Sequence, residues 1–192
     1  MKKKMKKIQA KRKGKITKEV ALPDGVSASV NGTRLLIKGP KGEVKRELRR
    51  QSISITVDNH KILFESKSET KRDKKIIGAL AAHARNMVNG CLQNHNYTIK
   101  ICSGHFPMNV SISSGKLIVK NFLGEKVPRV LHLKEGANVK VEGDLIYVTS
   151  ASKELAGQVT ADIEKLTRRP GYDSRIFQDG CYIIIKDGRE LK

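Results

Sequence analysis

The chain of 192 residues repeats part of itself, and this repeat constrains its fold more than any other feature. Residues 108–125 restate residues 26–43, 82 positions later. In both copies, alternating apolar residues lead into an apolar run that ends in lysine, and a Gly-Glu pair begins four residues after that lysine. The repeat predicts two similar units of roughly 80 residues, each large enough to bury its own core.

Local patterns divide each copy into strands followed by one helix. Alternating apolar residues between turn signals predict first-copy strands at 26–30, 35–38, 43–48, 53–57 and 62–64. The same signals predict second-copy strands at 98–102, 110–113, 117–120, 139–141 and 145–148. A last strand pair is predicted at 175–177 and 181–186, joined by a tight turn at 178–180.

Two apolar stripes at helical spacing predict the helices. The first, at 71–88, begins after Thr70 and ends in a cap at Asn89-Gly90; the second, at 153–167, begins after Ser152. Strands first and one helix last, twice over, predict an α+β fold: two tandem copies of an antiparallel β-sheet packed with one α-helix. The expected divisions are a basic N-terminal extension at 1–16, domains at 17–95 and 96–188, and a C-terminal tail at 189–192.

The charge of the chain points to a polyanionic partner. Lys and Arg number 39 against 19 Asp and Glu, for a net charge of +20, and half of this excess lies in residues 1–18. A segment of this charge density cannot bury enough apolar surface to fold, so we expect it to be disordered in isolation or threaded into RNA. Nucleic acid is the natural partner, because each neutralised phosphate releases a condensed counterion.

Other classes of function are disfavoured. No apolar run approaches the roughly 20 residues of a membrane helix. The three cysteines form no C-x-x-C pair, and the simplest interpretation is that they are reduced thiols in a cytoplasmic protein. The five histidines are scattered, and no catalytic or nucleotide-binding motif is present. We therefore expect no enzymatic activity, metal, cofactor or small-molecule substrate.

The composition also limits how RNA would be bound. Aromatic residues make up 4% of the chain and tryptophan is absent, so base stacking is not expected to be the main mode. Phosphate contact and shape readout remain. The candidate RNA-binding residues are Lys2, Lys3, Lys4, Lys6, Lys7, Lys11, Arg12, Lys13, Lys120, Lys126, Arg129, Arg168, Arg169, Arg175 and Lys186.

Several segments resemble one known family. They are Lys38–Gly42, Asn86–Gly90, His105–Met108, Asn121–Lys126 and Arg175–Tyr182. In this order they are similar to the universal large-subunit ribosomal protein family called L-six in bacteria and L-nine in eukaryotes, and the archaeal and eukaryotic branch fits best. The resemblance covers about residues 17–188.

This resemblance implies a function as well as a fold. It implies a non-enzymatic constituent of the cytoplasmic ribosome that binds large-subunit rRNA, mainly through its second domain, near the sarcin–ricin stem-loop. It also implies neighbouring large-subunit proteins and nearby translation factors as partners. The alternative is a non-ribosomal, basic RNA- or DNA-binding chaperone that binds through its lysine-rich extension. A third class, an RNA-modifying enzyme, would need a cofactor pocket that the sequence does not indicate.

Overall fold

The computed structural model describes residues 16–48, 52–58, 60–173 and 175–191. By contacts, these residues form two compact units. Unit 1 holds the described residues up to Leu36 together with Lys45–Arg85, and unit 2 holds Ile37–Val44 and the residues from Asn86 onward. The predicted domain boundary at residues 95–96 stays a prediction.

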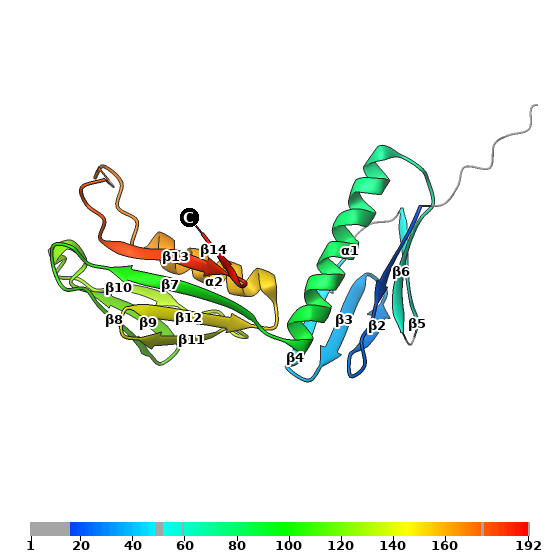
Figure 1. The fold of residues 1–192 in the computed structure, drawn as a ribbon, viewed down its shortest axis with the longest axis horizontal. Helices are drawn as coiled ribbons and strands as arrows, with labels where there is room; N and C mark the ends of the chain where they lie inside the picture. Colours follow the sequence, from blue (N-terminus) through cyan, green and yellow to red (C-terminus); the bar gives the residue numbers. More distant parts are fainter. Residues whose placement is uncertain (1–15, 49–51, 59, 174, 192) are drawn as a thin grey trace, which may run out of the picture. The chain divides into compact units, whose positions relative to one another are not determined.

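The first copy of the repeat forms two small antiparallel sheets and a long helix (Figure 1). Its elements are β1 (Thr17–Ala21), β2 (Ser27–Asn31), β3 (Arg34–Gly39), β4 (Gly42–Glu47), β5 (Ile53–Asp58), β6 (Lys61–Ser66) and α1 (Lys71–Leu92). The strand orders are β1-β6-β5 and β2-β3-β4. Thr70 begins α1 as predicted, because its hydroxyl accepts the backbone N–H of Asp73 at 3.1 Å.

The second copy repeats this plan and adds two strands. Its elements are β7 (His95–Cys102), β8 (Asn109–Ser113), β9 (Lys116–Lys120), η1 (Phe122–Gly124), β10 (Arg129–His132), β11 (Asn138–Glu142), β12 (Leu145–Ser150), α2 (Lys153–Leu166), β13 (Gly180–Lys186) and β14 (Arg189–Glu190). The sheets have the orders β11-β12-β7-β13-β14 and β10-β9-β8. Ser152 caps α2 as predicted, accepting the backbone N–H of Leu155.

The duplication predicted from the sequence is confirmed by the pairing of the strands. The order β1-β6-β5 in the first copy recurs as β7-β12-β11 in the second, and both sets are antiparallel. In unit 2 the core lies between the two sheets and α2, where Ile99, Leu117, Ile146 and Ile163 are almost fully buried. The α+β fold is therefore as predicted.

The structure corrects several boundaries. Helix α1 does not end at Asn89-Gly90 but continues to Leu92. Arg175 and Ile176 lie in a turn and Phe177 has no regular secondary structure, so the strand expected at 175–177 is absent from the described residues. Arg189 and Glu190, expected in a tail, pair with β13 as β14. β1 and β10 were not predicted, because each buries few apolar side chains and so lacks a clear alternating pattern. No helix among the described residues is long and apolar enough to span a bilayer.

Gly90 is required by a close approach of two backbones rather than by a helix cap. A Cβ atom added to Gly90 would overlap the carbonyl oxygen of Ala151. Helix α1 can therefore pass this close to Ala151 only because position 90 carries no side chain. By contrast, a Cβ added at Gly78, in the same helix, would meet only the flexible end of Lys18, at 3.8 Å.

We predict opposite effects for alanine at these two glycines. Gly90→Ala should lower the free energy of unfolding by about 1–3 kcal/mol or more, because backbone must move. Gly78→Ala should raise it by about 0.5–1 kcal/mol, through helix propensity alone. Urea denaturation of both variants measures the difference; stabilisation by both would contradict the close approach at Ala151.

Candidate nucleic-acid interface

Three loops meet at one end of unit 2. We call this region, residues 103–108, 121–128, 167–173 and 175–179, the three-loop end; it lies at the left of Figure 1. The strand register brings the loops together: β7 ends at Cys102 opposite Gly180, where β13 begins, and β9 ends at Lys120 opposite Asn109, where β8 begins. Loops distant in the sequence are therefore held next to one another at the ends of paired strands in two sheets.

Asp179 ties the first loop to the third. Its Oδ1 atom accepts the backbone N–H groups of Gly104 at 2.7 Å and His105 at 3.1 Å, and Nδ1 of His105 lies 3.1 Å from Oδ2. Burial by itself raises the pKa of this carboxyl, but the hydrogen bonds from His105 and Gly104 outweigh it, and the pKa is lowered. The turn predicted at 178–180 is wrong: Asp179 is instead a buried anchor.

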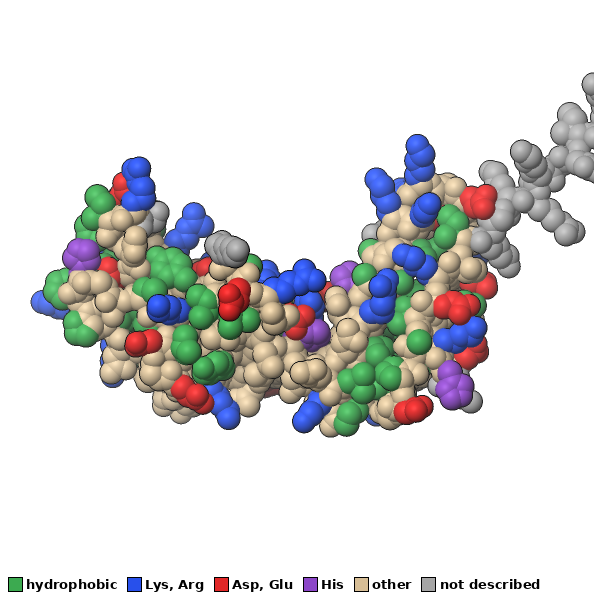
Figure 2. All heavy atoms as spheres, viewed as in Figure 1, with side chains coloured by type: hydrophobic (Ala, Val, Ile, Leu, Met, Phe, Trp, Pro, Cys, Tyr) green, Lys and Arg blue, Asp and Glu red, His purple; other side chains and the backbone are tan. Residues whose placement is uncertain are grey.

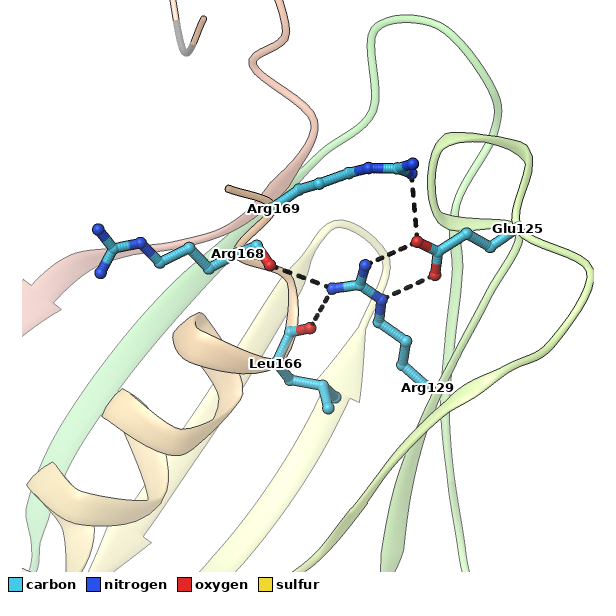
Figure 3. Close-up of polar contacts among 5 residues, drawn as sticks. All are labelled: Glu125, Arg129, Leu166, Arg168 and Arg169. Atoms are coloured by element: carbon cyan, nitrogen blue, oxygen red, sulfur yellow. Dashed lines mark hydrogen bonds and ion pairs between the residues drawn. The ribbon is translucent and has the colours of Figure 1, made fainter. Parts of the chain in front are cut away.

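Glu125 and Arg129 tie the second loop to the third (Figure 3). Nε and Nη2 of Arg129 donate to the two carboxylate oxygens of Glu125 at 2.8 and 2.7 Å. Nη1 donates to the carbonyl oxygens of Leu166 at 2.6 Å and Arg168 at 3.3 Å, so the guanidinium also satisfies the C-terminal end of α2. With its face 4.3 Å from the Phe122 ring, Arg129 is committed to internal contacts.

The other arginines of the third loop are more open. Arg169 Nη1 lies 3.2 Å from Glu125 Oε1, and its guanidinium lies 4.6 Å from the Tyr172 ring. The exposed Arg168 side chain points away from this cluster in Figure 3. Arg175 is 88% exposed and pairs with Asp173 at 2.8 Å, which lowers the pKa of Asp173 and raises that of Arg175. Arg168 and Arg175 can therefore meet an external anion.

The structure separates the candidate residues into three groups. Lys120, Lys126, Arg129, Arg168, Arg169 and Arg175 lie at or beside the three-loop end. Lys186 lies at the opposite end of β13, roughly 20 Å from Gly180 at about 3.3 Å per residue. The eight candidates between Lys2 and Lys13 lie outside the described residues.

Sequence reasoning missed an aromatic cluster between the cations. The rings of His105 and Phe177 stack with centroids 5.0 Å apart, and Tyr172 meets Phe177 edge-on at 4.9 Å. Phe106 and Ile176 beside them are half or more exposed. Figure 2 shows apolar and basic side chains next to one another over this end. Their proximity depends on Asp179, which no local pattern marks as an anchor.

We predict that Glu125→Gln destabilises the chain in a pH-dependent way. Hydrogen bonds from Arg129 hold the pKa of Glu125 below its ordinary value of 4.5, although burial opposes them. A lowered folded pKa stabilises the fold above the unfolded pKa, and this contribution is lost as pH falls through the folded value. The variant should lose about 1–2 kcal/mol at neutral pH.

The check is urea denaturation of both chains from pH 7 to pH 3. The gap in unfolding free energy between wild type and Glu125→Gln should narrow as the pH drops below 4.5. Glu142→Gln, at the exposed end of β11, is the matched control and should change stability little. A gap of constant size would show that the carboxylate charge of Glu125 does not hold the loops.

Comparison with known proteins agrees with this architecture. The family model described as ribosomal protein L6 matches residues 22–94 and 106–180. The large ribosomal subunit protein uL6 of Methanococcus vannielii is 39% identical over 176 residues, which cover 92% of this chain and 97% of that protein. The uL6 protein of Methanothrix thermoacetophila is 39% identical over 171 residues (89% and 97%), and that of Methanobrevibacter smithii is 37% identical over 172 residues (90% and 97%). Two matched segments that coincide with the two copies of the repeat show that this chain belongs to the ribosomal protein L6 family.

Proposed function

We propose that this chain is a structural protein of the large ribosomal subunit and binds folded rRNA through its three-loop end. Family membership supports the first part, since the relatives named above are large ribosomal subunit proteins. The family is structural, which confirms the expectation that the chain is not an enzyme. The chain would act in the ribosome of the cytoplasm, with large-subunit rRNA and neighbouring ribosomal proteins as its partners.

One observation carries the RNA-binding assignment: the loops that present the cations of the three-loop end are linked to one another by ion pairs and hydrogen bonds. Glu125 and Asp179 fasten the three loops through buried or half-buried contacts. Lys120, Lys126 and Arg168 are exposed around them. Loops that are already linked to one another lose little backbone freedom on binding, so the cations they carry suit a prefolded RNA whose phosphates are also fixed.

The finer location is part of the proposal. By family resemblance, the RNA contacted is the region near the sarcin–ricin stem-loop, where translation factors dock. Lys186 and the basic residues between Lys2 and Lys13 complete the proposed contact set, Lys186 as a separate contact from the opposite sheet end. Hydroxyl-radical footprinting of large subunits with and without this chain would test the location. Protection confined to other rRNA regions would contradict it.

We predict that Arg168→Ala weakens rRNA binding without altering stability. Losing one phosphate contact should reduce the slope of log affinity against log salt by roughly 0.7–0.9. Lys116→Ala is the matched control, because Lys116 is exposed at the other end of the strand that carries Lys120. Filter binding to purified large-subunit rRNA at several salt concentrations measures both. Equal slopes for Arg168→Ala and wild type would show that Arg168 stays in solvent.

Deleting residues 1–15 separates the proposal from the alternative of a basic chaperone. The deletion spares β1 and removes nine lysines and arginines. We expect the salt slope to fall by up to roughly 6–8 if all nine meet phosphates, while specific rRNA binding persists. Complete loss of rRNA binding in the shortened chain would favour the chaperone, which binds through its extension alone.

A further inference from the structure

A hollow opens at the three-loop end between the end of α2, the start of β13 and the third loop. Its volume is about 600 Å³, in the range of sites that hold small organic groups. Four of its lining residues are aromatic: Phe122, Tyr172, Phe177 and Tyr182. Phe122 is buried, whereas Tyr172 and Tyr182 are 44% and 40% exposed, so the hollow has a closed side and two accessible rings.

The aromatic residues of the chain are concentrated here. Of its eight phenylalanines and tyrosines, five lie at or beside the three-loop end: Phe106, Phe122, Tyr172, Phe177 and Tyr182. In RNA-binding proteins, exposed rings stack against unpaired bases. The low overall aromatic content therefore does not exclude stacking at this one place.

The polar groups of the hollow fit a nucleotide. Arg168 and Arg169 line it and supply positive charge for the phosphates on either side of a base. Glu164 also lines it; its Oε1 accepts the backbone N–H of Ile183 at 3.4 Å, and its Oε2 accepts no hydrogen bond among the described residues. The Asp179 carboxylate, by contrast, is engaged by Gly104 and His105.

We infer that this hollow binds one unstacked nucleobase of rRNA between its aromatic walls, with Arg168 and Arg169 at the flanking phosphates. Glu164 accepts a hydrogen bond from the exocyclic amino group of the base, which favours adenine, cytosine or guanine over uracil. The inference rests on the proposed function, because the base belongs to the same rRNA. It adds base recognition to a surface otherwise described by phosphate contact.

The experiment uses large subunits that contain wild type or a Tyr172 variant. Dimethyl sulfate and kethoxal modify the Watson–Crick edges of unprotected bases, and reverse transcription reads each nucleotide. Tyr172→Leu keeps apolar bulk but removes the ring, so it should expose one nucleotide that wild type protects. Tyr172→Phe should protect it like wild type. Leu191→Ala, which removes an exposed apolar side chain after β14, is the control and should change no nucleotide.

Affinity provides a second readout. Tyr172→Leu should weaken binding to purified rRNA on the order of 5- to 150-fold, as expected for loss of one base-aromatic stack. Unchanged modification at every nucleotide, with the variant still bound to the subunit, overturns the inference and leaves the proposed function intact. Loss of a neighbouring ribosomal protein without any nucleotide change also overturns it, since the hollow would then hold a protein side chain. Failure of wild type to bind the subunit would instead refute the proposed function.

Discussion

The ion pair between Glu125 and Arg129 is the interaction on which the proposed binding surface depends. In a chain with 39 basic and 19 acidic residues, loops rich in cations repel one another unless a carboxylate lies between them. Glu125 occupies that position between Arg129 and Arg169, and Arg129 extends the link to the end of α2. Asp179 does the same for the first loop through two backbone N–H groups. The few acidic residues of this region therefore link its loops to one another.

This arrangement divides cations of one type into two roles. Arg129 donates to two carboxylate oxygens and two carbonyl oxygens, a geometry that the planar guanidinium allows and a lysine could not reproduce. Arg168 gives only its backbone carbonyl to that cluster and turns its side chain outward. Arg129 therefore stabilises the surface from within, whereas Arg168 is exposed on it. Residue type alone does not distinguish them, because both sit in basic, turn-rich segments.

The overall composition likewise does not show where aromatic residues gather in the folded chain. An aromatic content of 4% argues against a stacking surface when averaged over the chain, yet Phe177 contacts both His105 and Tyr172. His105 and Phe177 are distant in sequence and meet because β7 and β13 are paired in the sheet. A hollow with aromatic walls and arginines at its rim follows from that pairing.

The sequence by itself determined the duplication, most of the strands in their order, and the starts of both helices. The strands and helix starts depend on periodicity and on hydrogen bonds between residues three positions apart, such as Ser152 with Leu155, so a short window contains all the partners. Only the tertiary structure decided that Gly90 passes close to Ala151, that Asp179 is an anchor rather than a turn residue, and that Lys186 lies at the end of β13 opposite the three-loop end. Those outcomes depend on strand register and backbone approach between distant segments. No local pattern records them, because each residue acquires its role from a partner that only the folded chain supplies.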